Sequence, residues 1–228
     1  FYGIHLLNVS SPTVKYNYIN NSAGGGTAHG NSLYGIFLNQ DAGDFECTYN
    51  SIHLDIKTSY YSMYFIRCEN KISSENISYN TFLTDTTIST GNLVFIYAAN
   101  ATPVKTIRGN SISGTITKPW GSIICYNGDG SGSGNSSNEI ITENNFSNIN
   151  SHGTCNIYGI YTSTVSNNTS ARKITKNILA NWTNCNNAYP ILVGYCDTNL
   201  VSFNIINNIS CKGTFTGISY SGAMSLCF

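Results

Sequence analysis

The sequence has few charged residues and no long apolar segment, and each shortage excludes a class of function. Charged residues make up 10% of the 228 residues, where ordinary globular domains have about 25%. The 11 basic residues balance 11 acidic ones, so the clustered basic excess that nucleic-acid binding or an electrostatic membrane anchor needs is missing. No apolar run reaches the roughly 18 residues of a membrane-spanning helix. We therefore expect no nucleic-acid partner and no membrane insertion.

Metal ligands with recognisable spacing are also lacking. None of the eight cysteines forms a CxxC pair or a Cys/His pair with zinc-ligand spacing. We expect no metal and no cofactor.

What the sequence does have is an internal repeat that covers the whole chain. An apolar residue, two variable residues, Asn, one variable residue and a second apolar residue recur seven times. The steps between successive Asn residues are 33, 30, 30, 34, 33 and 27 residues. A fixed period in this range indicates a repeat architecture. The Asn residues of the repeat are Asn17, Asn50, Asn80, Asn110, Asn144, Asn177 and Asn204.

The spacing inside the unit predicts a sharp turn at the Asn. Side chains alternate between the two faces of a strand, so two core positions five residues apart cannot both point inward without a break. Asn tolerates the left-handed conformation, and we expect it to supply this break. The residue two positions before the Asn is polar in all seven copies and is expected to face water. Stacked copies would form an Asn ladder, each amide bonding to the next.

A second apolar column, with units such as Tyr34-Gly35-Ile36 and Tyr158-Gly159-Ile160, precedes each Asn unit and predicts the first strand of each rung. Short strands with no helical periodicity between them predict an all-β fold, a right-handed parallel β-helix of about 7 to 8 rungs with three strands per rung. We expect residues 1–228 to form a single segment of this helix. Because no capping helix is evident at either end, we also expect it to be part of a longer protein.

The Asn unit resembles the parallel β-helix repeat of the pectate-lyase-like superfamily, and the Tyr-Gly-Ile rungs resemble the Asn-rich and Ser-rich repeats of secreted bacterial surface proteins. The resemblance covers essentially the whole chain. It implies the fold, but the superfamily includes lyases, hydrolases, adhesins, tailspikes and inert stalks. The Asn-x-Asp, paired Asp and Gly-His-Gly pattern of inverting hydrolases is absent, and so are Lys and Arg constellations of the lyase type.

One cluster could support hydrolysis if the chain is an enzyme. His53 and Asp55 are expected to point outward from a strand, and Asp85 occupies the column of Asp55 one rung further on. Two carboxylates about 5 Å apart would suit a retaining glycosidase, or could share a proton or bind Ca²⁺. Eleven acids spread over the rungs will often place two in such positions by chance, so we expect no catalytic site here.

The tyrosines suggest a binding surface instead. The position before the Asn is Tyr16, Tyr49 and Tyr79 in the first three units, and it is Glu143 and Lys176 in later ones. The charged residues indicate that this column is accessible. The three tyrosines would form an aromatic strip that binds sugar rings or a protein, or would cover a corner of the core.

The eight cysteines leave two interpretations open. Cys155, Cys185 and Cys211 follow their Asn units at similar distances, so some should stack on neighbouring rungs, at a separation compatible with disulfides. They could equally be buried free thiols that act as small apolar residues.

These features favour a non-enzymatic segment of a secreted or cell-surface protein, acting as a stalk, adhesin or filament building block. Its expected partners are glycans, neighbouring chains or flanking domains. The alternatives are a polysaccharide lyase or glycoside hydrolase of the pectate-lyase-like type, or a viral tailspike.

Overall fold

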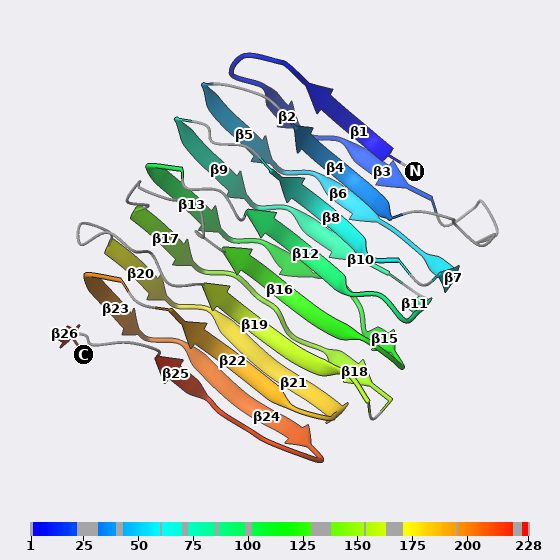
Figure 1. Cartoon of the computed structure of the whole chain (residues 1–228), viewed down its shortest axis with the longest axis vertical. Helices are drawn as coiled ribbons and strands as arrows, with labels where there is room; N and C mark the ends of the chain where they lie inside the picture. Colours follow the sequence, from blue (N-terminus) through cyan, green and yellow to red (C-terminus); the bar gives the residue numbers. More distant parts are fainter. Residues whose placement is uncertain are drawn as a thin grey trace.

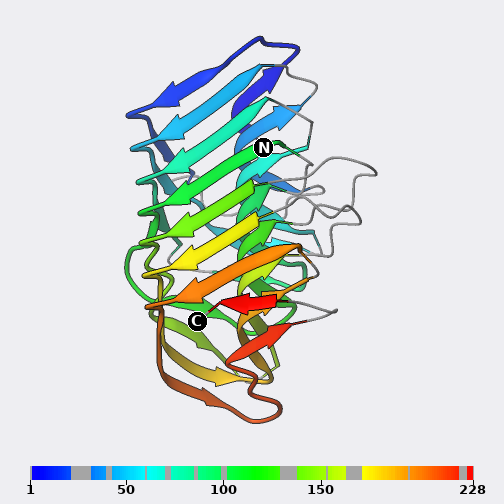
Figure 2. The ribbon, with the colours of Figure 1, turned by 90° about the vertical axis from the view of Figure 1, so that its left-hand side faces the viewer.

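The computed structural model is all-β and parallel throughout the residues it describes (Figure 1). These are residues 2–21, 32–39, 43–59, 61–69, 73–84, 87–98, 102–128, 138–152, 154–162, 171–194, 196–220 and 225–227. Within them the chain winds repeatedly around one axis, and the strands stack in three faces (Figure 2). The predicted parallel β-helix is confirmed. The described part of the chain contains no helix of the length and apolar character that crossing a membrane requires.

Two faces are eight-stranded sheets in which each strand pairs with its counterpart on the next rung. The first sheet consists of β1 (Tyr2–Leu7), β4 (Leu33–Asn39), β8 (Met63–Cys68), β12 (Leu93–Ala98), β16 (Ser122–Gly128), β19 (Asn156–Thr162), β22 (Ala188–Val193) and β25 (Ile218–Tyr220). The second sheet consists of β2 (Thr13–Lys15), β5 (Asp44–Thr48), β9 (Ser74–Ser78), β13 (Val104–Arg108), β17 (Asn138–Thr142), β20 (Ala171–Thr175), β23 (Thr198–Ser202) and β26 (Ser225–Cys227).

The third face is divided between two four-stranded sheets. One contains β3 (Tyr18–Asn20), β6 (Ser51–His53), β10 (Thr81–Leu83) and β14 (Ser111–Ile112). The other contains β15 (Ile116–Lys118), β18 (Ile149–Ser151), β21 (Ile178–Cys185) and β24 (Ile205–Cys211). Single bridges through Asn145 join the two, and β7 (Ile56–Ser59) pairs with β11 (Thr87–Ser89) beside them.

The Asn ladder runs along the corner between the second sheet and the third face. At each step the Asn Nδ2 donates to the Oδ1 of the Asn on the next rung at 2.9 to 3.0 Å, from Asn17 through to Asn204. The same Oδ1 atoms also accept the backbone N–H of the preceding Asn at 3.0 to 3.1 Å. The seven Asn residues span about six turns of the chain, slightly fewer than the 7 to 8 rungs expected.

The predicted role of the Asn in the turn is wrong in one respect. The left-handed residue at each corner is the one before the Asn, with φ between +55° and +63°. The Asn side chain can therefore point inward, where its amide replaces the hydrogen bonds that the turning backbone cannot make. The left-handed residue points outward, which places its side chain on the surface.

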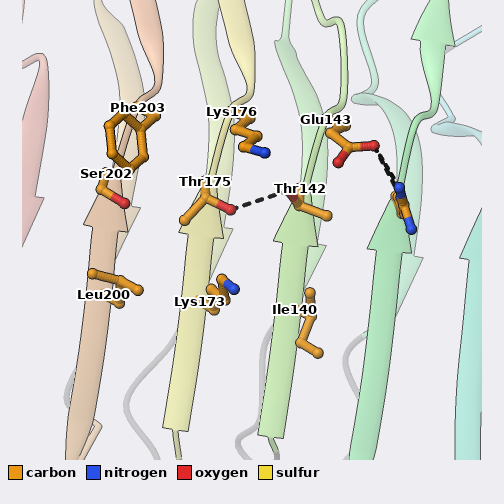
Figure 3. Close-up of a pocket in the computed structure, with 10 residues that line it drawn as sticks. Ile140, Thr142, Glu143, Lys173, Thr175, Lys176, Leu200, Ser202 and Phe203 are labelled. Carbon is orange, nitrogen blue, oxygen red and sulfur yellow. Dashed lines mark hydrogen bonds and ion pairs between the residues drawn. The ribbon is translucent and has the colours of Figure 1, made fainter.

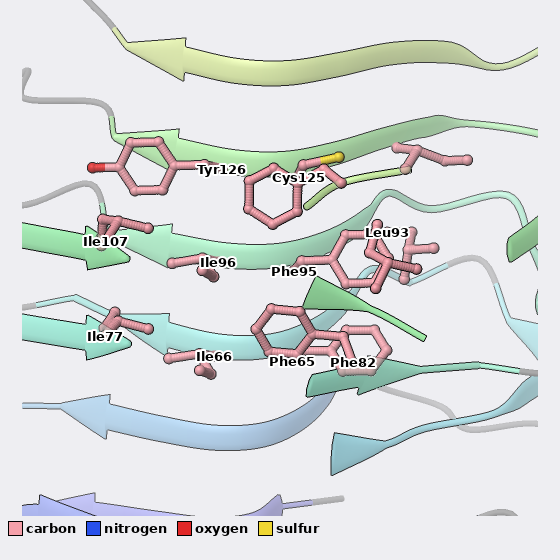
Figure 4. Close-up of a cluster of buried hydrophobic side chains, with 14 of the residues drawn as sticks. Phe65, Ile66, Ile77, Phe82, Leu93, Phe95, Ile96, Ile107, Cys125 and Tyr126 are labelled. Atoms are coloured by element: carbon pink, nitrogen blue, oxygen red, sulfur yellow. The ribbon is translucent and has the colours of Figure 1, made fainter. Parts of the chain in front are cut away.

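The core lies between the three faces and adjusts its packing from rung to rung. Phe65 and Phe95 extend inward from the first sheet and pack against Phe82 of the third face, with ring centroids 4.9 to 5.6 Å apart (Figure 4). On a later rung the equivalent position is Gly159, and a Cβ there would lie 2.9 Å from Cη2 of the buried Trp182. A large side chain on one face is thus matched by a small one on the other, which keeps the interior filled.

Candidate functional site

The left-handed corner residues form a continuous exposed line, which we call the corner ridge. It consists of Tyr16, Tyr49, Tyr79, Gly109, Glu143, Lys176 and Phe203. The positive φ turns each side chain away from the core because the following Asn occupies the inward position. Both ends of the ridge are well exposed, with Tyr16 at 74% and Phe203 at 82%. The predicted accessibility of this column is confirmed.

The three predicted tyrosines stack on one another. The ring centroids are 5.3 Å apart for Tyr16 and Tyr49 and 5.1 Å apart for Tyr49 and Tyr79, with planes within 10° of parallel. Carbon atoms of two stacked rings are in contact at about 3.5–4.0 Å. Because the centroids are further apart than this, the rings are offset-stacked, each displaced sideways from the next. Each ring therefore leaves its edge and part of one face open to solvent.

The tyrosine stack ends at Gly109. A Cβ on this glycine would lie 2.5 Å from Cδ1 of Tyr79, so only glycine lets the ring rest on the backbone. The Arg108 guanidinium lies 5.7 Å from the centroid of the same ring. Arg108 also forms an ion pair with Glu143 at 2.9 Å, and the hydrogen bond and charge of Glu143 raise the pKa of Arg108. Beyond the end of the aromatic stack, the ridge therefore continues with charged side chains.

Beside this second half of the ridge lies a groove on the outer surface of the second sheet (Figure 3). It has a volume of about 400 Å³. Its lining comes from strands β13, β17, β20 and β23 and the corners that follow β17, β20 and β23, and comprises Arg108, Ile140, Thr142, Glu143, Lys173, Thr175, Lys176, Leu200, Ser202 and Phe203. Four of these belong to the polar column that the sequence predicts to face water, and that prediction is wrong for Thr48, Ser78 and Thr175, which are buried.

The groove combines positive charge, hydroxyl groups and one open aromatic face. Three cations face a single carboxylate, an excess of two positive charges on a chain that is neutral overall. The hydroxyls of Thr142 and Thr175 bond to each other at 3.0 Å (Figure 3). Phe203 closes one end of the row. Such a surface can bind a polar ligand that also presents an apolar face.

A second aromatic surface covers the outer face of the first sheet. Register pairing stacks two outward columns, the first being Tyr2, Tyr34, Tyr64, Val94, Ile124, Tyr158 and Tyr189, and the second His5, Phe37, Arg67, Tyr97, Asn127, Tyr161 and Leu192. This surface was not expected from the sequence. The signal was present in the Tyr-Gly-Ile units, where the tyrosine precedes the inward-facing residues.

Arg67 lies at the centre of the N-terminal half of this surface. Its guanidinium carbon is 4.4 to 5.8 Å from the ring centroids of four aromatic residues, Tyr34, Phe37, Tyr64 and Tyr97. It also forms an ion pair with Glu69. The guanidinium is therefore held by the ion pair and by ring contacts within the chain, and the rings packed around it are fixed in place.

The structure brings together two of the three candidate catalytic residues. His53 Nε2 lies 3.3 Å from Asp55 Oδ2, and Thr84 donates to the other oxygen of Asp55 at 3.2 Å. Both side chains are only 11% exposed, so the expectation that they point into solvent is wrong. The reason is that Asp55, beyond the end of β6, is bonded to Thr84 and Asn21 of the neighbouring rungs and lies against His53, the last residue of β6. Asp85 lies outside the described residues.

A column of charged residues is buried where the first and second sheets meet. Register pairing stacks Glu75, Lys105, Glu139 and Arg172 on successive rungs, and each is at most 2% exposed. Arg172 Nε lies 2.5 Å from Glu139, and Lys105 Nζ lies 3.9 Å from the same carboxylate. Tyr126 donates its hydroxyl to Glu139 at 3.0 Å. The alternating signs compensate one another inside the protein.

At the Glu75 end of this column the buried charge is less well compensated than in the middle. Burial raises the pKa of Glu75, although the positive charge of Lys105 opposes the shift. The thiol of Cys68 lies beside Glu75, and burial raises its pKa as well. These groups are enclosed by the core, so they serve the fold rather than a ligand from solution.

Within the described residues there is no cluster of three or more His, Cys, Asp or Glu side chains that could hold a metal ion.

Neither protein-family profiles, nor curated proteins, nor solved structures give a match to this chain. What the fold defines is the architectural class, a parallel β-solenoid. The function therefore has to be argued from the surfaces of the molecule.

Proposed function

We propose that this chain is a non-enzymatic, adhesive or structural segment of a secreted or cell-surface β-helix, and that it binds glycan chains along the corner ridge and its groove. The observation that carries the proposal is the continuity of this exposed line across about six turns of the chain. We further propose a relationship to the pectate-lyase-like β-helices, because the Asn unit that suggests it occupies the equivalent corner of every turn.

The chemistry of the ridge suits sugars. The exposed aromatic surface of the tyrosine stack and of Phe203 can pack against the apolar faces of sugar rings. The hydroxyls and cations of the groove can bond to sugar hydroxyl and acidic groups. Because the rigid ladder fixes the spacing of these groups, an extended chain lying along the axis could contact several rungs at once.

Binding is favoured over cleavage by the contrast between two sites. The acid and base that the described residues place in contact, His53 and Asp55, are nine-tenths covered. The side chains of the ridge are open. A polysaccharide can reach the ridge without rearrangement of the fold.

The test is a screen of the purified chain on polysaccharides and host glycans, with and without Ca²⁺, that records binding and released sugar ends together. We expect binding without release. Tyr49→Ala and Phe203→Ala should weaken it about 2- to 10-fold, the loss expected for one aromatic contact. Tyr18→Ala is the matched control, because Tyr18 is also a well-exposed tyrosine, 69% accessible, but lies on the third face.

Two results would contradict the proposal. Release of sugar ends that Asp55→Asn abolishes would establish an enzyme. Binding that survives both ridge variants but is lost in Tyr158→Ala would move the binding site to the outer face of the first sheet.

A further inference from the structure

Three cysteines stack on successive rungs near the C-terminal end of the third face. The backbone N–H of Asn186 donates to the carbonyl of Cys155, and that of Lys212 donates to the carbonyl of Cys185, both at 2.8 Å. Cys185 of β21 and Cys211 of β24 are direct register partners. These two strands lie side by side in the lower part of the stack (Figure 1). The predicted stacking of cysteines is thus confirmed for this group, and all seven cysteines with described side chains are free thiols.

The directions of the thiol groups distinguish the two possible disulfide pairs, Cys155 with Cys185 and Cys185 with Cys211. Cys155 donates its thiol to the carbonyl of Lys118, on the preceding rung, at 3.2 Å. Cys185 donates its thiol in the opposite direction, to the carbonyl of Ser210 at 3.3 Å. Ser210 is the residue immediately before Cys211, so the Cys185 thiol points toward Cys211 and away from Cys155.

Separation and access fit a stepwise reaction between this pair. Neighbouring strands are about 4.8 Å apart, within the roughly 4.4–6.8 Å between Cα atoms that disulfides span. Cys211 is partly exposed, whereas Cys185 is completely buried. Burial and the nearby Cys211 raise the pKa of Cys185 to about 11. A soluble reagent would therefore meet Cys211 first.

We infer that Cys211 and Cys185 form a thiol modification site, in which Cys211 takes up a low-molecular-weight disulfide and Cys185 resolves the product into a bond between rungs. In the first step the Cys211 thiolate attacks one sulfur of oxidised glutathione and releases glutathione thiolate. In the second, Cys185 loses its proton and attacks Cys211 Sγ, releasing a second glutathione. The protein loses two thiol hydrogens and two electrons, and one glutathione disulfide becomes two thiols.

Three other cysteines in the sheets provide internal references. Cys47, Cys68 and Cys125 are fully buried, and none has a cysteine as a register partner. Burial raises the pKa of all three. They should stay reduced under conditions that oxidise Cys185 and Cys211.

The experiment treats the whole chain with oxidised glutathione at mildly alkaline pH, blocks free thiols, and maps disulfides by mass spectrometry of an unreduced digest. We expect a Cys185–Cys211 linkage in the native chain and in the control Cys155→Ser. In Cys185→Ser, Cys211 should instead retain glutathione, and Cys211→Ser should show neither product.

Three outcomes would overturn the inference. One is equal accumulation of glutathione on Cys211 with and without Cys185. Another is a linkage from Cys185 or Cys211 to a different cysteine. The third is a Cys211 that stays unmodified while the protein is folded, as judged by its thermal unfolding transition.

Discussion

Replacing one Asn in the middle of the ladder tests the main stabilising feature of the fold. The side chain of Asn110 is fully buried and makes four hydrogen bonds. Its Nδ2 donates to the carbonyl of Ile77 at 2.9 Å and to Asn144 Oδ1 at 3.0 Å. Its Oδ1 accepts the backbone N–H and the side-chain Nδ2 of Asn80, both at 3.0 Å. Asn110→Ala removes all four.

The magnitude follows from the donors that lose their acceptor. The backbone N–H of Asn80 and one N–H of its amide would remain buried without Asn110 Oδ1, and each unsatisfied donor costs about 1–3 kcal/mol. We therefore expect the free energy of unfolding to fall by about 2–6 kcal/mol. For a chain of this size that corresponds to roughly 5–20 °C in Tm.

The first Asn of the ladder provides a matched control. Asn17 donates to Lys15 and to Asn50, but it is half-buried. Its replacement removes two donors and leaves only acceptors behind, and Asn50 Oδ1 still accepts the backbone N–H of residue 17. We expect Asn17→Ala to cost about 1 kcal/mol or less.

Thermal and urea unfolding of the two variants measure this difference, and amide hydrogen exchange locates it. The N–H of Asn80 should be protected in the native chain and exchange quickly in Asn110→Ala. Equal destabilisation by the two replacements, or an Asn80 amide that stays protected in Asn110→Ala, would refute the reasoning.

Three further predictions concern the interior. Glu139→Gln leaves the buried Arg172 without its carboxylate, so the free energy of unfolding should fall by about 3–5 kcal/mol in urea titration. The pKa of Glu75 is raised above its ordinary value of 4.5, so its stabilising contribution is complete below that pH and is lost as pH rises through the folded pKa. The Tm of Glu75→Gln should therefore rise relative to that of the native chain as the pH increases above 4.5, and a difference that does not change with pH would contradict this. Gly159→Val should clash with Trp182 and cost about 1–3 kcal/mol or more, which Trp fluorescence during denaturation would detect.

The repeat could be predicted from sequence because it depends on local and periodic constraints. Each Asn unit has to turn the chain, place two apolar residues inward and present an amide to the next rung, and the same residue types recur for each task. The assignment of the turn to the Asn itself was wrong because tyrosine, glutamate and lysine rarely adopt positive φ. Tyr16 and Lys176 do so here because the ladder fixes the residue that follows them.

The candidate sites were harder to predict because they depend on how neighbouring rungs cover one another. The tyrosine strip follows from a single column and was found. The burial of His53 and Asp55 depends on contacts with Thr84 and Asn21, which lie 29 and 34 residues from Asp55 in sequence. Alternation along one strand carries no information about such contacts.

The buried charge column illustrates the same limit and has a structural consequence. A charged residue at an alternating position is normally interpreted as exposed, yet Lys105, Glu139 and Arg172 face inward because their neighbours on adjacent rungs carry the opposite sign. A slip of two residues along one strand would preserve the alternation of apolar and polar residues. It would also move Glu139 by about 6.6 Å relative to Arg172, leaving a buried charge unpaired at a cost of about 3–5 kcal/mol. The apolar columns define the fold, and the charge column favours one register within it.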